Sequence, residues 1–436
     1  MRFLYLLVKI TFQIPFRIFF KRIERVNITK AAHSRTIYIA NHASSFMDPV
    51  MLGTLTNPVI YYMVRADVFK PFLIKIFHSL HMMPIYREQD GGDTKAKNDE
   101  VFLKCNDLLK KGRNILVFAE GFTDDVFVRR LKPLKKGAAR IAFGALEAMD
   151  WSEKMYIQTV GINYTDPGKM RSEILFEGGE IICLNDYHEA YKASAPRVIT
   201  LITNLIDKNL KAVITHVADE SLTETHEQVM EISRKGMNFL NYDHSITLKE
   251  RKEYAQQLAM FFNSNAQEPF FVEFTDRVKA YRKALIDRGV SEEIIYNKAT
   301  NNTSIVVDVL LLVLISPFVL LGFLHSFIPY RIAKGFVEKT FGRKVFWSSA
   351  KVGIGNVLFG IWNLPLVITA GCYFDINGFI VFGYILLMIP FSFVLWHSVT
   401  SRLDRISAKL KAKDDALSDL VKQREGLLQE INEFNF

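Results

Sequence analysis

The first residues in the sequence that could do chemistry are Asn41, His42 and Asp48, which follow a short apolar run at residues 36–40. A histidine is the side chain best suited to accept a proton near neutral pH, and such general-base catalysis is worth about 10²–10⁴ in rate. An aspartate one to two turns further on could accept the other ring N–H and orient the imidazole. A lone His–Asp pair at this spacing is more often structural, so its interpretation depends on other motifs.

A second polar group follows another apolar run, at residues 114–118. Glu120 and Gly121 come directly after this run, and a glycine there allows close approach of the backbone. A cationic stretch at residues 129–140 leads into a predicted helix, and a helix N-terminus with nearby lysines suits an anion. Arg87 ends a third short apolar element and could bind a phosphate through two hydrogen bonds. Each cation taken alone is more simply a solvated surface residue.

Several common sites are absent from the sequence. It contains no G-x-S-x-G nucleophile elbow, no glycine-rich phosphate loop and no H-E-x-x-H motif. The three cysteines are far apart, which argues against a disulfide framework or a zinc site. The net charge of +9 comes without the interleaved aromatic and basic residues typical of nucleic-acid binding. The charge therefore indicates phosphate or a membrane surface rather than nucleic acid.

In this order and at this spacing, the motifs resemble those of the phospholipid/glycerol acyltransferase superfamily, which includes glycerol-3-phosphate and 1-acylglycerol-3-phosphate O-acyltransferases. The matching residues are Asn41, His42 and Asp48 for the first motif, Arg87 for the second, Phe118, Glu120 and Gly121 for the third, and residues 160–164 for the fourth. The likeness covers roughly residues 25–220. Five residues separate His42 from Asp48, as in a branch of fungal-type glycerol-3-phosphate acyltransferases that also carry C-terminal membrane segments.

The resemblance implies a reaction without an acyl-enzyme. His42 would deprotonate an acceptor hydroxyl, which attacks the thioester of an acyl-CoA or acyl carrier protein directly, while Asp48 holds the histidine. No metal and no cofactor would be needed beyond this thioester co-substrate. The residues that the resemblance assigns to substrate binding are Arg87 for the phosphate, Lys135 or Lys136 as helpers, and Glu120 and Gly121 for the shape of the pocket.

These motifs need a scaffold that brings the ends of several strands together. Short runs rich in Ile, Val, Phe and Tyr predict buried strands at residues 36–40, 59–64, 114–118, 157–163 and 173–176. Helical stretches at 98–111 and 136–149 separate several of them. The alternation predicts a layered α/β domain with a mostly parallel sheet over residues 31–220, of the glycerol-3-phosphate-acyltransferase type by resemblance. Residues 221–302 are charged and predict a helical segment.

The overall composition indicates a mosaic. The chain of 436 residues is 23% charged, yet its mean hydropathy is slightly above zero. The apolar excess is concentrated in residues 309–330, 352–374 and 376–396, which contain no Asp, Glu, Lys or Arg. At about 1.5 Å per residue, each run could span roughly 30 Å of hydrocarbon. We therefore expect a membrane-embedded region at residues 303–398.

The topology follows from the charges between these runs. The linker 331–351 and the segment after residue 400 are rich in Lys and Arg, whereas the connection at Asp375 has no positive charge. If positive residues stay cytoplasmic, the last two runs form a hairpin, and the catalytic domain of this integral membrane protein lies on the cytoplasmic side. The first run, 309–330, would then enter and leave on the same side, with a bend at Pro317. A plain third span is the alternative.

The N-terminus has a different pattern. Residues 1–30 combine apolar side chains with seven Lys or Arg and one Glu. This pattern predicts an amphipathic helix in the membrane interface, attracted to anionic lipid. The alternative is an ordinary amphipathic helix that packs on its own domain.

The C-terminal tail, residues 400–436, has a heptad pattern. Eight of ten seam positions between Leu403 and Phe434 are apolar. The pattern predicts a coiled coil and hence a homodimer through residues 403–434. The alternative is an amphipathic helix that folds back on the protein.

The resemblance, together with the uncharged apolar runs, thus implies a membrane-bound O-acyltransferase of phospholipid biosynthesis. It would transfer a fatty acyl chain from an acyl thioester to a hydroxyl of glycerol-3-phosphate or 1-acylglycerol-3-phosphate, with membrane lipid as a further partner and no nucleic acid. The acceptor stays open, and another lysolipid is one alternative. A catalytically inactive membrane tether is a rival from a different class, against which the presence of His42, Asp48, Arg87 and Glu120 argues.

Overall fold

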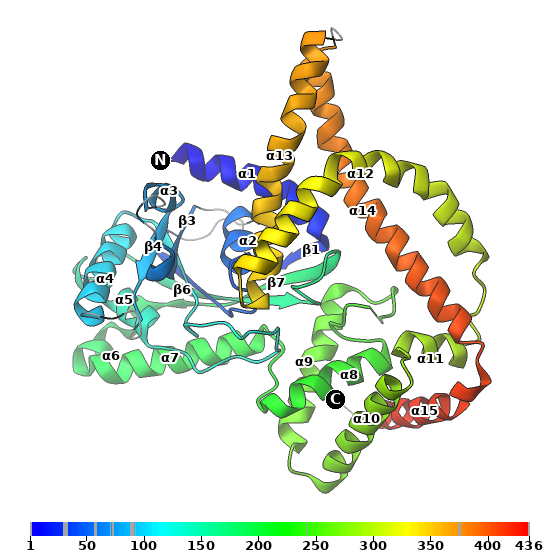
Figure 1. Ribbon diagram of the computed structural model, residues 1–436. Coiled ribbons are helices and arrows are strands. Elements are labelled where there is room, and N and C mark those ends of the chain that lie inside the picture. Colours follow the sequence, from blue (N-terminus) through cyan, green and yellow to red (C-terminus); the bar gives the residue numbers. More distant parts are fainter. Residues whose placement is uncertain are drawn as a thin grey trace.

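Seven strands form one sheet at the centre of the N-terminal domain (Figure 1). The computed structural model describes residues 2–28, 34–55, 59–69, 71, 74–87, 91, 93–240, 242–373 and 376–434. The strands are β1 Phe20–Val26, β2 Thr36–Ala40, β3 Ile60–Arg65, β4 Met82–Ile85, β5 Asn114–Val117, β6 Tyr156–Tyr164 and β7 Ser172–Cys183. Their order is β1-β7-β6-β2-β5-β3-β4, and every neighbouring pair is parallel except the antiparallel pair β6–β7. The predicted α/β domain with a mostly parallel sheet is confirmed, and β1 and β4 are additional strands.

Helices cover both faces of the sheet, which explains why every residue of the central strands β2 and β5 is buried. The helices of this domain are α1 Arg2–Phe19, α2 Met47–Leu55, α3 Ile74–Ser79, α4 Thr94–Lys110, α5 Gly137–Glu147, α6 His188–Ala193 and α7 Ala195–Ala212. On β2, Ile37 and Ile39 belong to the core that includes α4, α5 and α7, whereas Tyr38 and Ala40 belong to the core on the other face with α1 and α2. The side chains of β2 thus alternate between two apolar layers.

The N-terminal helix is shorter than the predicted 1–30, because α1 ends at Phe19 and the chain continues as β1. β1 pairs in parallel with β7 at one edge of the sheet. Lys21, Arg22 and Arg25 therefore belong to the sheet, where an edge strand tolerates charged side chains. Lys30, the last basic residue of the predicted helix, lies outside the described residues.

The two faces of α1 have different surroundings. Tyr5 and Phe16 are buried in the core between α1, α2 and the sheet. Leu6, Ile10 and Ile14, spaced four residues apart, are exposed on another face. The helix thus packs on its own domain, as the alternative expects, and still presents an apolar stripe of the kind that a membrane interface accepts.

A separate helical core follows the α/β domain and contains the C-terminal tail. Its helices are α8 Thr223–Ser233, α9 Leu248–Asn265, α10 Pro269–Asp287, α11 Glu292–Ala299 and α15 Ser418–Glu433. The 3₁₀ turns among all the described residues are η1 Ala66–Val68, η3 Leu184–Tyr187, η4 Glu220–Leu222, η5 Lys344–Phe346 and η6 Asp415–Leu417. Leu420, Leu427 and Ile431 of α15 are buried in the same core as residues of α8, α9, α10 and α11.

This arrangement differs from the predicted coiled coil at residues 400–436. The helix that enters the tail ends at Lys411, and the turn η6 separates it from α15. The apolar seam of α15 faces its own chain, so the seam proposed to join two copies at 403–434 is largely used within one copy. A heptad pattern describes an apolar stripe but not the surface that covers it, so the fold-back alternative fits the structure better.

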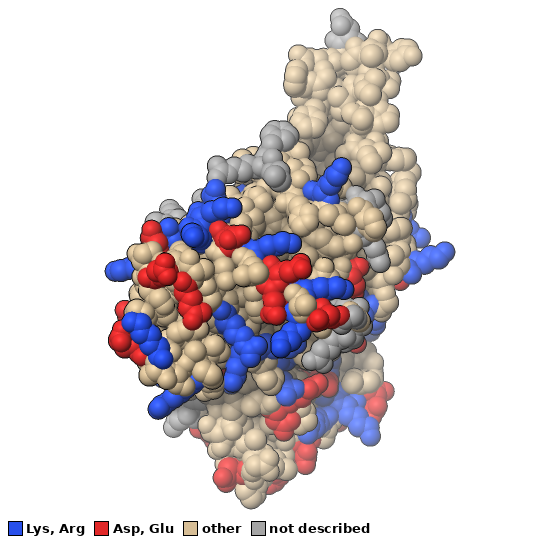
Figure 2. All heavy atoms as spheres, turned by 90° about the vertical axis from the view of Figure 1, so that its left-hand side faces the viewer, with Lys and Arg blue, Asp and Glu red and all other residues tan. Residues whose placement is uncertain are grey.

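Three helices are long and apolar enough to cross a membrane: α12 Val306–Thr340, α13 Trp347–Tyr373 and α14 Gly378–Lys411. α13 and α14 form a hairpin that projects from the globular part (Figure 1). On the face shown in Figure 2, Lys, Arg, Asp and Glu cover the globular part, whereas the projecting end carries none of them among the described residues. An uncharged projection of this kind suits the hydrocarbon of a bilayer.

α12 has the shape of an arch in Figure 1, and both its ends lie on the side of the hairpin near the globular part. This shape agrees with the prediction that the first apolar run enters and leaves on the same side. The helix contains Pro317 and Pro329, and each proline removes one intrahelical hydrogen bond. The connection at Asp375 lies outside the described residues.

Polar contacts join the arch to the hairpin at several places along α12. Asp308, near the start of α12, forms ion pairs with Arg402 at 3.2 Å and Lys409 at 3.0 Å on α14. Further along α12, Nδ1 of His325 lies 2.9 Å from Oδ1 of Asn363 on α13. Because unpaired polar groups are costly in hydrocarbon, such pairs favour association of the three helices.

Gly322 gives a direct test of how closely α12 packs on α14. A Cβ at Gly322 would lie 2.0 Å from Cβ of Ser392, whereas a Cβ at Gly335 meets no described atom within 4 Å. We expect Gly322→Ala to cost about 1–3 kcal/mol through overpacking. Gly335→Ala serves as the control and should be neutral or stabilise by up to about 1 kcal/mol through helix propensity. Thermal unfolding in detergent measures the difference, and equal melting temperatures would contradict this packing.

The arch also predicts which side of a membrane each connection faces. In sealed vesicles, a membrane-impermeant maleimide should label Lys192→Cys in the α/β domain and Lys344→Cys in the α12–α13 linker from the same side. Ile376→Cys at the tip of the hairpin should be labelled from the opposite side. Each cysteine is introduced after replacement of Cys183 and Cys372, because Cys105 is buried. Labelling of Lys344→Cys from the side opposite to Lys192→Cys would instead show that α12 spans the membrane.

Candidate active site

His42 and Asp48 form a dyad at the carboxyl end of β2. Nδ1 of His42 lies 2.9 Å from Oδ2 of Asp48. Asp48 is fully buried at the first turn of α2, where an acidic residue is favoured by the helix dipole. If Nδ1–H donates to the carboxylate, Nε2 of His42 is left to accept a proton. The geometry is that of an oriented general base, as the spacing predicts.

Asp48 has two further donors. The backbone N–H of Ser44 donates to Oδ2 at 2.8 Å, and the hydroxyl of Tyr164 donates to Oδ1 at 2.7 Å. Burial, followed by the neighbouring Asp48, raises the pKa of Tyr164 well above its usual value, so the phenol stays a donor at neutral pH. Three donors compensate a carboxylate that has no access to water. Tyr164 is the last residue of β6 and lies in the fourth motif, but its role was not predicted.

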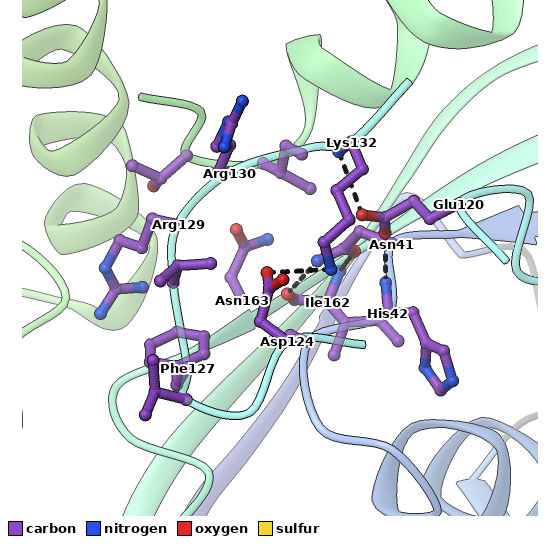
Figure 3. Close-up of a pocket in the computed structure, with 15 residues that line it drawn as sticks. Asn41, His42, Glu120, Asp124, Phe127, Arg129, Arg130, Lys132, Ile162 and Asn163 are labelled. Carbon is purple, nitrogen blue, oxygen red and sulfur yellow. Dashed lines mark hydrogen bonds and ion pairs between the residues drawn. The ribbon is translucent and has the colours of Figure 1, made fainter. Parts of the chain in front are cut away.

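Glu120 bridges two backbone segments. Its Oε1 accepts from the N–H of His42 at 2.6 Å, and its Oε2 accepts from the N–H of Lys132 at 3.1 Å (Figure 3). Burial raises the pKa of this carboxyl, while the two backbone N–H groups act in the opposite direction. Glu120 therefore positions His42 and the cationic loop relative to one another. This contact agrees with the expectation that Glu120 shapes the pocket.

Gly121 has a φ of +79°, a conformation that favours glycine. A Cβ at this position would lie 3.0 Å from Cε and Nζ of Lys135, so the glycine also makes room for this lysine. Lys135 is held further by its N–H, which donates to the carbonyl of Ala119 at 2.9 Å. Lys136 points elsewhere, because its Nζ donates to the hydroxyl of Thr200 on α7. Of the two predicted helper lysines, only Lys135 lies beside Glu120 and Gly121.

A pocket lined in part by His42 and Glu120 contains a different lysine, Lys132, while the imidazole of His42 points away from Lys132 and Asp124 (Figure 3). The described residues that line it are Asn41, His42, Ala43, Glu120, Asp124, Val126, Phe127, Val128, Arg129, Arg130, Lys132, Ile162, Asn163, Ile214 and Thr215. Nζ of Lys132 forms an ion pair with Asp124 at 2.9 Å and donates to the carbonyl of Phe122 at 3.3 Å. Lys132 belongs to the cationic stretch that the sequence singled out, but which of its lysines reaches the pocket depends on the loop geometry.

Arg87 is not among the described residues that line this pocket. It follows β4, and its Nη2 lies 3.6 Å from Oδ2 of Asp67. Arg65, at the end of β3, also pairs with Asp67. Because β2, β3, β4 and β5 are parallel, both arginines lie on the same edge of the sheet as His42 and Glu120. The structure thus places Arg87 on the predicted edge but not in direct contact with the dyad.

Two other polar residues of the pocket hold the fold together. Asn41 donates to the carbonyl of Ile162 at 3.0 Å and accepts from its N–H at 2.7 Å, which joins the end of β2 to β6. Arg129 donates to the carbonyl of Tyr164 at 2.8 Å and to Glu227 of α8 at 2.6 Å. The asparagine of the first motif therefore aligns two strands, and Arg129 connects the α/β domain to the helical core.

The class of this domain follows from the site and from one comparison. Residues 22–163, about a third of the chain, match the family model described as Acyltransferase. The match includes the residues of the first three motifs, and it confirms the resemblance to the phospholipid/glycerol acyltransferase superfamily for this part of the chain. The finer resemblance to the branch with five residues between His42 and Asp48 stays a prediction. No curated protein matches the chain.

Within the described ranges, no group of three or more His, Cys, Asp or Glu side chains could hold a metal ion. The expectation that acyl transfer needs no metal and no cofactor stays a prediction.

Tyr164 can be tested as a positioning residue. Tyr164→Phe leaves Asp48 buried with one donor fewer, which should cost on the order of 1–3 kcal/mol and lower kcat about tenfold, because the dyad is less well fixed. Tyr281→Phe is a matched control: it removes a hydrogen bond of 2.5 Å from a buried tyrosine to Glu292 in the helical core. Unfolding and acyl-transfer assays should show a stability loss in both variants and a kcat loss only in Tyr164→Phe. Equal kcat values would contradict the role of Tyr164.

Proposed function

We propose that the chain is a membrane-bound O-acyltransferase of phospholipid biosynthesis. It transfers a fatty acyl chain from an acyl thioester, carried by coenzyme A or acyl carrier protein, to a hydroxyl of glycerol-3-phosphate or 1-acylglycerol-3-phosphate. The observation that carries this proposal is the His42–Asp48 dyad beside a cationic pocket, within a domain that matches an acyltransferase family.

The dyad supports a direct transfer. Nε2 of His42 takes the proton of the acceptor hydroxyl as the oxygen forms a bond to the thioester carbonyl carbon. Asp48 stabilises the imidazolium that results. The carbon–sulfur bond then breaks, and the leaving thiolate takes the proton from His42. Among the described residues that line the pocket there is neither serine nor cysteine, which favours this route over an acyl-enzyme.

Cations near the dyad support a phosphorylated acceptor. Lys132 lies in the pocket and is neutralised by Asp124, an ion pair that a phosphate could rearrange. Arg87 and Arg65 share Asp67 on the same edge of the sheet. By the resemblance, Arg87 binds the phosphate of the acceptor. The acylation of another lysolipid uses the same chemistry and remains the alternative for the acceptor.

The membrane elements support a lipid substrate. The hairpin α13–α14 is long and apolar enough to cross a bilayer, and α1 presents an apolar stripe close to its base. Such an anchor keeps the pocket near the surface from which an acyl chain is taken or into which the product is released. The basic linker and tail favour a catalytic domain on the cytoplasmic side, because positive residues tend to stay there.

The tether hypothesis predicts liposome binding without acyl transfer. A degenerate site would have no reason to retain a buried carboxylate with three donors, because such a group is costly when its partners are lost. The complete dyad therefore favours the enzyme.

The decisive experiment is an acyl-transfer assay with the purified chain in detergent. It compares glycerol-3-phosphate, 1-acylglycerol-3-phosphate and another lysolipid as acceptors, with acyl-CoA and acyl carrier protein as donors. His42→Ala should lower kcat at least about 10²-fold, because it removes the general base. His188→Ala is the control: it removes an imidazole that stacks on Trp151 in the same domain, at 4.0 Å between ring centroids.

Three results separate the hypotheses. Transfer by the unsubstituted chain and by His188→Ala, but not by His42→Ala, supports the proposal, and the preferred acceptor then identifies the substrate. Near-normal transfer by a folded His42→Ala would overturn it. Liposome binding without transfer to any acceptor would favour the tether.

A further inference from the structure

The linker between the membrane helices α12 and α13 contacts the two loops that build the active site. The part of the basic segment 331–351 that connects the two helices is residues 341–346, here called the α12–α13 linker, and it contains the turn η5. One of the loops is residues 41–46, which contains His42 and precedes Asp48. The other is residues 118–136, which contains Glu120 and Lys132. Both contacts are made by residues far apart in the sequence, and neither takes part directly in the proton and acyl transfers described above.

Arg343 makes the first contact. Its Nε donates to the carboxylate of Asp125, and its Nη2 donates to the carbonyl oxygen of Thr123 at 2.6 Å. The guanidinium thus binds one side chain and one backbone group of the same turn. Such a two-point contact restricts the turn more than a single ion pair would.

Phe346 makes the second contact. Its ring lies on that of Phe46, with 5.3 Å between the ring centroids. Phe46 stands two residues before Asp48 and is the last residue before α2. An aromatic pair at this distance is favourable beyond the area that it buries.

Both contacts lead to His42. Next to Asp125, the side chain of Asp124 pairs with Lys132, and the N–H of Lys132 donates to Glu120, which also accepts from the N–H of His42. From the other direction, Phe46 lies in the loop that joins His42 to Asp48. The linker therefore contacts both segments whose relative position determines where the imidazole lies.

The linker itself is fixed from within. Nε1 of Trp347 donates to the carbonyl oxygen of Phe341 at 2.8 Å, which closes the linker into a loop. The rings of Phe341 and Phe346 lie 6.2 Å apart, and Lys351 on α13 pairs with Glu338 on α12 at 2.7 Å. A closed linker of this kind can hold the catalytic loops against the membrane helices.

We propose that Arg343 and Phe346 are positioning residues of the active site: they hold the loops 41–46 and 118–136 in their relative position and thereby couple the membrane helices to acyl transfer. This inference deepens the proposed function and rests on it for its kinetic consequence. Displacement of the linker, for example by a change in α12, would move both loops at once. The arch and the hairpin would then do more than anchor the chain.

Arg343 offers a clean test because its contact with Asp125 is partly solvated. The side chain of Arg343 is 37% exposed and that of Asp125 is 73% exposed, so the pair contributes little to global stability. Arg343→Gln should therefore fold and enter the membrane normally. Lys344→Gln is the matched control, since it removes the same charge from the next position, for which the described contacts include no ion pair with an acidic side chain.

The kinetic measurement compares these variants in acyl transfer. Arg343→Gln should lower kcat about fivefold to tenfold while the KM for the acceptor changes less, because the imidazole is misplaced and the acceptor site remains. Lys344→Gln should behave as the unsubstituted chain. The charge-reversed single variant Arg343→Asp should be more impaired, and the combination with Asp125→Arg should recover activity, since it restores the ion pair. A purely global effect on stability would not be rescued in this way.

Hydrogen exchange measures the contact without relying on activity. In Arg343→Gln and in Phe346→Ala, amides of residues 119–128 and 42–48 should exchange at least about threefold faster than in Lys344→Gln. Arg343→Gln with the kcat and the exchange of Lys344→Gln would overturn this inference and leave the proposed function intact. If even the unsubstituted chain and Lys344→Gln transfer no acyl group, the proposed function fails, and the exchange rates still decide whether the linker holds the loops.

Discussion

The candidate active site depends on one buried carboxylate. Asp48 has no exposed surface, and the free energy needed to keep its charge away from water is offset by three hydrogen-bond donors. These donors come from the imidazole of His42, from a backbone N–H in the same loop and from Tyr164 on β6. The requirement for all three fixes the loop after β2, the start of α2 and the register of β2 against β6. The position of the histidine follows from these constraints.

The neighbouring carboxylate, Glu120, has a complementary task. It accepts two backbone N–H groups, from His42 and from Lys132, and so joins the loop after β2 to the loop after β5. Both strands are parallel and adjacent in the sheet, which brings their carboxyl ends to the same edge. One carboxylate thus orients the imidazole and the other sets the distance between the two loops. Contacts from the membrane linker reach both loops from outside the domain.

The membrane region explains the composition of the chain. Its apolar excess lies in an arched helix and a hairpin rather than in a larger core, and several charges near their bases are paired, as in Asp308 with Arg402 and Lys409. The positive charge is divided among β1, the cationic loop beside the active site and the α12–α13 linker. In these places Arg22 pairs with Glu173, Lys132 with Asp124 and Arg343 with Asp125. A basic, slightly apolar average therefore describes two separate regions and not a uniform protein.

The sequence by itself determined the features that arise from local periodicity and from residue type. Uncharged runs identified three helices long and apolar enough to cross a membrane, and buried apolar runs identified five of the seven strands. His42, Asp48 and Glu120 were found because polar residues after a strand lie at the edge of the sheet where ligands bind. The tertiary structure decided the contacts between distant segments. Tyr164 lies 116 positions from Asp48, and only the sheet register makes it a donor. Likewise, the position of Lys135 depends on the room that Gly121 leaves, and the strand β1 depends on β7 as a partner. The apolar residues of the tail helix α15 are covered by the helical core of the same chain. A local pattern states what a segment needs to bury or bind, whereas the fold selects which surface supplies it.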